Sequence, residues 1–124
     1  MRERSIHVLD DDDTKIVDLL IKLGFKKNVA NVIVFLSKVD GATSRSIEYA
    51  ADLRQPEVSI TMREMHQHNW VLEREIKQGG KGRPIKEYRL AVDIGSIVDE
   101  IEALKKREFE EDMDCIRKLK DLIK

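Results

Sequence analysis

Basic side chains and three glycines are gathered in one stretch, "KQGGKGRPIKEYRL", at residues 77–90. Its first four basic side chains are Lys77, Lys81, Arg83 and Lys86. Glycine lets a backbone bend and approach another molecule closely, and lysine and arginine attract phosphate. The stretch therefore fits three descriptions: the phosphate-cradling loop of an enzyme, a solvated turn, or a finger that reaches toward a polyanion.

A phosphate loop of the nucleotide-hydrolase kind requires features that this stretch lacks. Such a loop ends in Lys-Ser or Lys-Thr and leads into a helix, whose N–H groups meet the phosphates. Here Arg83 and Pro84 lead into alternating residues typical of a strand. A solvated turn and a finger remain, and "KGRP" is similar to the core of AT-hook peptides, in which the arginine lies along a narrow A·T groove.

No other set of residues has the spacing of a catalytic or metal site. His66 and His68 are two positions apart, which on a helix separates them by about 200° and prevents joint ligation. Ser59 has no histidine and carboxylate at a revealing spacing, and Cys115 is the single cysteine, so no disulfide or cysteine-rich zinc site can form within the chain. We expect no catalytic residue, no metal and no cofactor. The alternative of an enzyme that acts on a small anion is supported only by the basic, glycine-rich stretch at residues 77–90.

The length and composition of the chain limit the kind of fold that can position these side chains. The chain has 124 residues, enough for one domain, with 41% hydrophobic and 38% charged residues, the latter above the usual value of about 25%. No apolar run is long enough to span a bilayer and no signal peptide is recognised, so we expect a cytoplasmic protein. Although the net charge is -1, residues 14–92 hold 14 basic and 9 acidic side chains.

Helical spacing predicts two helices before the centre of the chain. Ile16, Leu19, Leu20 and Leu23 recur at that spacing after the acidic run of residues 10–13, and Gly24 ends the segment. The next segment, "NVANVIVFLSKVDG", has a continuous apolar stripe that favours a buried helix over a strand despite its β-branched residues.

Two shorter helices and a hairpin are predicted next. Thr43 and Ser44 can cap "SRSIEYAADL", and Pro56 suits the first turn of a helix over residues 55–68. Val58, Met62 and Met65 give that helix a buried stripe. Asn69 tolerates the left-handed conformation that ends a helix, and "WVLEREI" and "IKEYRLAV" alternate like two strands joined by the glycine-rich stretch.

This order resembles the winged helix-turn-helix transcription regulators. The residues that carry the resemblance, "SRSIEYAADLRQPEVSITMREMHQHNWV", are similar to the paired helices of the archaeal ArsR/MarR/TrmB-like regulators, although Asn69 stands where a glycine usually precedes the strand. The resemblance implies an α+β, mostly helical fold and sequence-directed binding to duplex DNA. It covers residues 14–92, after an acidic segment at 1–13 and before a C-terminal helix at 93–124.

The outward residues of the helix at 55–68 suit the edges of base pairs in a major groove. Gln55 offers an amide, Ser59 a hydroxyl, Ile60 a contact for a thymine methyl, and Arg63 a guanidinium for guanine. Glu57 either accepts from cytosine or complements the helix dipole, and we favour the dipole. The full set of expected DNA contacts is Ser44, Arg45, Gln55, Ser59, Ile60, Arg63, Lys77, Lys81, Arg83 and Lys86.

The last segment predicts a helix of roughly 30 residues with an apolar seam longer than one small domain needs. We expect either a homodimer built on this seam, with two recognition helices about 34 to 36 Å apart, or a helix that folds back onto its own domain. Cys115 is expected to be a small buried apolar group or, at a symmetric seam, to approach its counterpart in the second copy. The expected dimer residues are Ile94, Ile97, Ile101, Leu104, Phe109, Met113, Ile116, Leu119 and Ile123.

A second hypothesis is a protein-interaction module that keeps the winged-helix fold, because the chain has acidic ends and a long seam. Many regulators of the family carry an effector pocket or metal site, and the sequence displays neither.

Overall fold

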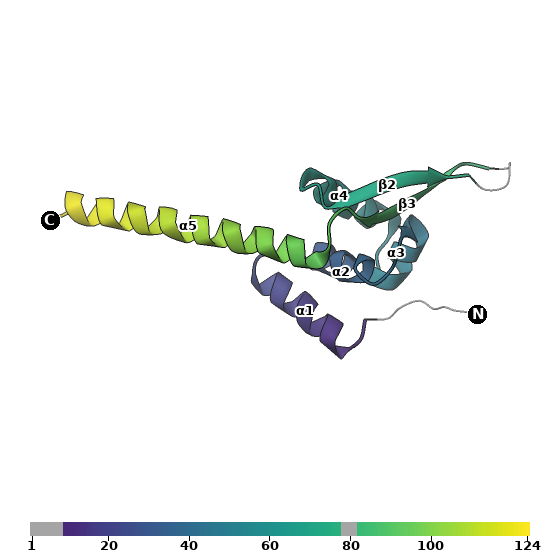
Figure 1. Ribbon diagram of the computed structural model, residues 1–124, viewed down its shortest axis with the longest axis horizontal. Coiled ribbons are helices and arrows are strands. Elements are labelled where there is room, and N and C mark those ends of the chain that lie inside the picture. Colours follow the sequence, from purple (N-terminus) through teal and green to yellow (C-terminus); the bar gives the residue numbers. More distant parts are fainter. Residues whose placement is uncertain (1–8, 78–81) are drawn as a thin grey trace. The chain divides into compact units, whose positions relative to one another are not determined.

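The computed structural model describes residues 9–77 and 82–124 of the chain, which divides into two compact units, Met1–Ile94 and Gly95–Lys124. The first unit carries four helices and three strands, and the second consists of the final helix (Figure 1). The elements are α1 (Asp11–Lys22), α2 (Lys27–Leu36), β1 (Ala42–Thr43), α3 (Ser44–Ala51), α4 (Gln55–Gln67), β2 (Val71–Ile76), β3 (Ile85–Leu90) and α5 (Ile94–Leu122).

The acidic run at residues 10–13 forms the start of α1. The side chain of Asp10 accepts from the N–H of Asp13 at 2.8 Å, and the side chain of Asp13 accepts from the N–H of Asp10 at 3.0 Å. This reciprocal pair satisfies two N–H groups that the first turn would otherwise leave unpaired. Nζ of Lys38 lies 2.7 Å from Asp13, and this hydrogen bond holds the pKa of Asp13 below its ordinary value.

The buried face of α1 differs from the apolar stripe in the sequence. Val17 and Leu20 are buried with Ala30 and Val34 of α2, whereas Leu19 is 60% exposed. Ile16 and Leu23 are exposed as well. The face that α1 turns inward is set by its contact with α2, so Leu20 is the one buried residue of the four-residue stripe and the other three remain exposed.

The helix α2 is the centre of the first unit, where it contacts α1, α3, α4 and β3. Seven of its ten residues are buried, which explains why its sequence is apolar on every side. The prediction of a buried helix rather than a strand is confirmed. The length of the segment outweighs the preference of its valines for strands.

Three helices of this unit end in a left-handed residue. Gly24 has φ 111°, Asp52 has φ 56° and Asn69 has φ 60°. After α4, the N–H of Trp70 donates to the carbonyl of Met65 and the N–H of Asn69 donates to that of His66, both at 3.0 Å. These two bonds form a Schellman motif, and the role predicted for Asn69 is confirmed.

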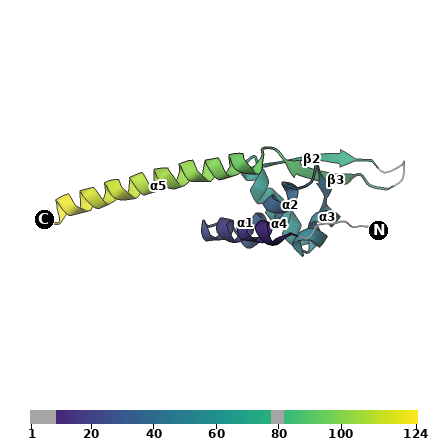
Figure 2. The same cartoon turned by 60° about the horizontal axis from the view of Figure 1, so that its bottom comes forward.

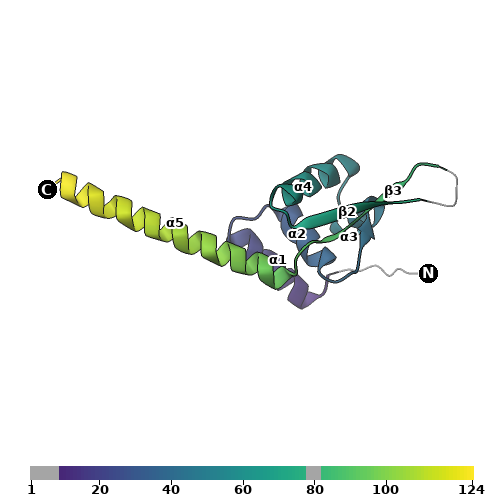
Figure 3. The same cartoon turned by 45° about the horizontal axis from the view of Figure 1, so that its top comes forward.

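The small sheet has three strands in the order β1-β3-β2, one more than the predicted hairpin. Ala42 of β1 pairs with Tyr88 of β3, and β3 pairs antiparallel with β2 from Val71 and Leu90 to Ile76 and Ile85. The hairpin packs on the helix pair, β2 against α4 and β3 against α3 (Figures 1 and 3). Since β1 has two residues, it is too short to show an alternating pattern in the sequence.

The second unit is formed by α5, a single continuous helix of 29 residues that begins at the last residue of the first unit, as expected (Figure 2). Within the described residues, none of the helices has the length and apolarity that crossing a bilayer requires. Cys115 is exposed, so the expectation that this side chain is buried is wrong for a single chain. Its neighbours along α5 are mostly charged, which leaves the thiol in contact with solvent.

Candidate nucleic-acid interface

The outer face of α4 carries the side chains that the sequence places there. Gln55, Ser59, Ile60 and Arg63, which we call the recognition face, are all exposed, and Ile60 is 52% exposed. On the opposite side Val58, Met62 and Met65 are buried, as predicted, together with Thr61. The buried stripe fixes the rotation of the helix about its axis, and this presents the recognition face to solvent.

The first turn of α4 shows what Glu57 does. Its Oε1 accepts from the backbone N–H of Arg54 at 2.8 Å, so this carboxylate stabilises the start of the helix. Pro56 occupies the first turn, where its missing N–H costs nothing. The carboxylate of Glu57 is thus hydrogen-bonded within the chain, which agrees with the role at the helix start that we favoured over a contact with cytosine.

The preceding helix α3 begins at Ser44, and its cap is Thr43 alone. The hydroxyl of Thr43 accepts from the N–H of Ser46 at 3.2 Å. Ser44 lies half-buried in the first turn, and Arg45 beside it is exposed. Arg45 thus has a guanidinium available to a ligand, whereas Ser44 offers only part of its surface.

The basic residues of the hairpin fall into two groups. Lys77 and Arg83 follow β2 and precede β3, and both side chains are exposed without an ion pair among the residues that the structure describes. Gly82 has φ 84°, a conformation that favours glycine. Lys81 and the predicted bend at Gly79 and Gly80 lie outside the described residues.

Lys86 is held by a carboxylate of the neighbouring strand. Its Nζ lies 3.3 Å from Oε2 of Glu73, while Oε1 of Glu73 lies 2.7 Å from Nε2 of His66 in the last turn of α4. The hydrogen bond from His66 and the interaction with Lys86 hold the pKa of Glu73 below its ordinary value. In turn, the hydrogen bond to Glu73, and after it the charge of that carboxylate, raise the pKa of Lys86.

A second ion pair crosses the hairpin on its other face. Nε of Arg74 donates to Oε1 of Glu87 at 2.7 Å, and the two residues face each other in the register. Glu87 also packs on Gly41, where an added Cβ would lie 2.9 Å from the carboxyl carbon of Glu87. The absence of a side chain at Gly41 therefore gives the carboxylate room to reach Arg74.

Two exposed side chains beside the recognition face were missed by sequence reasoning. Arg54 precedes α4, and Tyr49 of α3 is 74% exposed. Both lie on the helix pair that contains the recognition face. The available signals were a basic residue two positions before Pro56 and an aromatic residue outside the Ile47 stripe, but neither has a distinctive spacing.

In the part of the chain that the structure describes, histidine and the other ligating side chains do not form a metal site. No group of three His, Cys, Asp or Glu side chains able to hold an ion occurs in residues 9–77 and 82–124. His68 stacks on Trp70 with ring centroids 4.1 Å apart, and Trp70 stacks on Phe25. His66 and His68 are therefore engaged separately, one with a carboxylate and the other with an aromatic ring.

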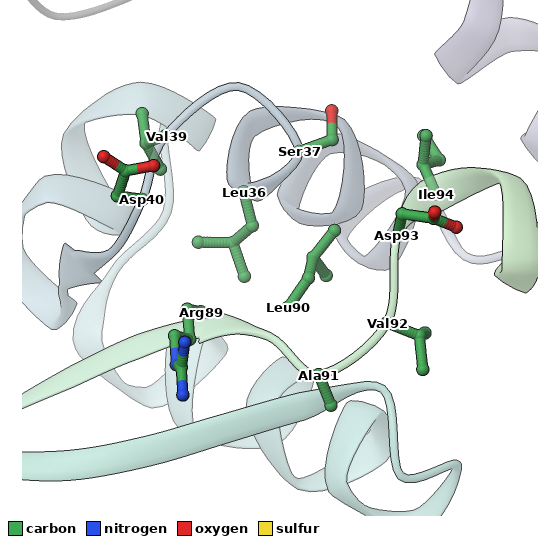
Figure 4. Close-up of a pocket in the computed structure, with 10 residues that line it drawn as sticks. All are labelled: Leu36, Ser37, Val39, Asp40, Arg89, Leu90, Ala91, Val92, Asp93 and Ile94. Carbon is green, nitrogen blue, oxygen red and sulfur yellow. The ribbon is translucent and has the colours of Figure 1, made fainter.

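The first unit has a surface hollow of about 390 Å³ where β3 ends. Leu36 and Leu90 point into it, and Arg89, Asp40 and Asp93 lie around it (Figure 4). A smaller hollow of about 280 Å³ lies between the start of α2 and α4. Only the smaller one contains a residue of the recognition face, Ile60.

The expected dimer residues differ in how much surface they offer in a single chain. Ile97 is fully buried, and Ile94 and Ile101 are half-buried. The exposed members are Leu104, Phe109, Met113, Ile116, Leu119 and Ile123. Within the expected dimer set, the exposed apolar residues therefore begin at Leu104, while Val98, outside that set, is exposed as well.

Solved structures share this fold at low sequence identity. An archaeal chromatin protein, TrmBL2, whose structure is described as showing a novel mode of DNA binding, has a TM-score of 0.69 and 16% identity; the match covers 88% of this chain and 39% of that protein, so the chain spans well under half of its length. A possible transcriptional regulator from Methanosarcina mazei has a TM-score of 0.64 and 13% identity, covering 92% and 98% of the two chains. MepR, a transcription regulator of a multidrug efflux pump in Staphylococcus aureus, has a TM-score of 0.51 and 14% identity, covering 90% and 87%.

The sequence itself matches no protein-family model and no curated protein. The three structural neighbours are a chromatin protein, a possible transcriptional regulator and a transcription regulator. With a helix pair, a three-stranded sheet and a long final helix, this chain has the winged helix-turn-helix fold that these neighbours share.

Proposed function

We propose that this chain is a sequence-specific regulator of transcription that binds duplex DNA as a homodimer. The observation that carries the proposal is the recognition face of α4, whose polar side chains are exposed and have no hydrogen-bond partner within the described part of the chain. The fold shared with DNA-binding regulators supports it. Such a protein acts where the genome lies, so we place it in the cytoplasm.

The recognition face suits the major groove. A helix fits that groove, and each base pair presents a distinct pattern of donors, acceptors and methyl groups there. Gln55 suits adenine, Arg63 suits guanine, and Ile60 suits the methyl group of thymine. Ser59 binds a base or a phosphate. Arg45, Arg54 and Tyr49 provide further contacts to the backbone of the DNA.

The hairpin supplies affinity that does not depend on sequence. Lys77 and Arg83 are exposed on both sides of the loop that joins the strands. Each cation that neutralises a phosphate releases a counterion and so strengthens binding at low salt. We assign Arg83 and Lys77 to the backbone or the minor groove.

A second copy completes the proposed regulator. The apolar side chains of α5 beyond Leu104 are exposed, and Phe109 is 64% exposed. A symmetric pair of such helices buries this seam and brings two recognition faces to one DNA duplex. The exposed Ile16, Leu19 and Leu23 of α1 add apolar surface that a second copy can cover.

Binding to a selected duplex tests the proposal. A duplex is selected from a random pool with the full chain, and its dissociation constant is measured from 50 to 200 mM salt beside a scrambled duplex. We expect the preferred duplex to bind at least about 10³-fold more tightly than the scrambled one, with affinity that falls steeply as salt rises. Absent binding, or binding that salt does not change, contradicts the proposal.

The exposed apolar seam of α5 also favours a second candidate, a protein-interaction module with a winged-helix fold. Capture of partners from a lysate treated with nuclease separates the two. Partners bridged by DNA are lost after the treatment, whereas direct protein partners remain. Retention of one stoichiometric partner, together with no duplex binding, favours the second candidate.

A further inference from the structure

One carboxylate connects the end of the recognition helix to both strands of the hairpin. Oε1 of Glu73 in β2 lies 2.7 Å from Nε2 of His66 in α4, and Oε2 lies 3.3 Å from Nζ of Lys86 in β3. Each oxygen therefore holds one basic group, and the two groups come from different elements.

The register of the hairpin gives Lys86 a choice between two carboxylates. Glu75 lies directly opposite Lys86, and Glu73 lies opposite Tyr88, on the same face of the sheet. Lys86 nevertheless pairs with Glu73 on the diagonal, which a long side chain can reach. The bond to His66 holds the carboxylate of Glu73 in place, whereas Glu75 is exposed without an ion pair in the described residues.

The pair changes what Lys86 offers to a polyanion. A lysine in solvent neutralises a phosphate and releases a counterion, which adds affinity for any DNA sequence. A lysine held by a fixed carboxylate must leave that partner first, and the carboxylate itself repels phosphate. The recognition face of α4 makes no such internal pairs and keeps its capacity to read bases.

We propose that Glu73 is a positioning residue that raises the selectivity of DNA binding by withholding Lys86 from phosphate. This inference rests on the proposed function as a DNA-binding protein. It adds that an ion pair within the chain keeps one basic side chain of the hairpin from phosphate. The part of the affinity that any DNA sequence would share is therefore smaller.

The test measures the salt dependence of binding to a scrambled duplex for the full-length chain and its variants. Glu73→Gln removes the charge and keeps an acceptor for His66, so Lys86 becomes available to one phosphate. The slope of log affinity against log salt becomes steeper by about 0.9, and affinity falls about threefold more than in the parent between 50 and 200 mM. The preferred duplex gains less affinity than the scrambled one.

Glu75→Gln is the matched control, because it removes the same charge two residues along the same strand face. It leaves the slope within about 0.3 of the parent. The double variant Glu73→Gln with Lys86→Gln has the slope of Lys86→Gln alone, since the effect passes through Lys86. A purely structural role for Glu73 would lower thermal stability without changing these slopes.

Other outcomes overturn the inference. A parent-like slope for Glu73→Gln, an equal increase for Glu75→Gln, or a double variant as steep as Glu73→Gln each contradicts it. If Glu73→Gln does not fold, Lys86→Gln decides alone: a parent-like slope supports the inference, and a loss of about 0.9 contradicts it. When the parent binds DNA and only these results fail, the proposed function stands; a parent that does not bind removes both.

Discussion

The recognition face of α4 and the base of the β2–β3 hairpin use their polar side chains in opposite ways. Gln55, Ser59 and Arg63 point to solvent from a helix that is anchored by a buried stripe on its other side. In the hairpin, Lys86 pairs with Glu73, and Arg74 pairs with Glu87 across the strands. The hydrogen-bonding groups of the helix are thus available to a ligand, whereas several charged side chains of the hairpin form ion pairs with one another.

This difference separates two components of binding. Groups that read base edges must be free of internal partners, because a satisfied donor gains little from a base. Charges that bind phosphate can be tuned by neighbouring carboxylates without altering the readout. We therefore expect changes in α4 to alter which sequence is bound, and changes in the hairpin to alter how strongly any sequence is bound.

Loss of the anchor of α4 is the largest expected effect. Met65 is fully buried, so Met65→Ala leaves a cavity and lowers the free energy of unfolding by about 2 to 5 kcal/mol. Ile60→Ala on the exposed face is the matched change, and it alters that free energy by less than about 0.5 kcal/mol. Denaturant unfolding followed by circular dichroism measures both. Equal losses would show that α4 is not oriented as described.

Arg63 should control base preference. Arg63→Ala is expected to reduce discrimination at one base pair by about 1 to 3 kcal/mol, because a bidentate contact with guanine is lost. Binding to a panel of duplexes, each with one base pair changed, locates that position. A uniform loss across the panel, with discrimination intact, would place Arg63 on the backbone instead.

Arg83 should control salt dependence. Arg83→Ala removes one phosphate contact, so the slope of log affinity against log salt becomes shallower by about 1 for every duplex. Discrimination between the preferred and scrambled duplexes stays the same within error. If Arg83→Ala abolishes discrimination and leaves the slope unchanged, the roles assigned to helix and hairpin are reversed.

The ion pair of Asp13 and Lys38 lies outside both regions, and it should affect stability alone. The pKa of Asp13 is lowered from 3.8 in the folded chain, chiefly by the hydrogen bond from Lys38. The stabilisation by the charged carboxylate is therefore complete above pH 3.8 and is lost as pH falls through the lower folded value. Asp13→Asn should lower the melting temperature slightly at pH 6 and flatten its decline below pH 4.

The neighbouring substitution Asp12→Asn is the control for that change, because the pair of Asp12 with Lys15 is exposed at 4.0 Å. It should leave the decline of the melting temperature below pH 4 unchanged. Neither variant should alter the affinity for DNA. A loss of duplex binding in Asp13→Asn at pH 7 would show that the start of α1 contributes to the interface.

Local patterns were enough to predict much of the fold. The stripe of Val58, Met62 and Met65 predicted which side of α4 is buried, and Asn69 predicted where the helix ends. Each of these depends on neighbours within a few residues along the chain. The same holds for the hairpin, where two alternating runs flank a glycine-rich loop.

Features that depend on distant contacts were not predictable from the sequence. The strand β1 forms because Ala42 pairs with Tyr88, and a strand of two residues is too short to show an alternating pattern in the sequence. The inward face of α1 depends on its packing against α2, so Val17 is buried although it lies outside the predicted stripe, of which only Leu20 is buried. The capture of Lys86 by Glu73 required the register of the hairpin and the position of His66.

Protection of guanine N7 from methylation tests the central claim most directly, since that atom lies in the major groove. With the preferred duplex, the account predicts protection in two adjacent major grooves on one side of the DNA, about 34 to 36 Å apart. Arg63→Ala should restore reactivity at one guanine in each groove, and Arg83→Ala should leave the pattern intact. Full N7 reactivity in a saturated complex would contradict the placement of α4 in the major groove.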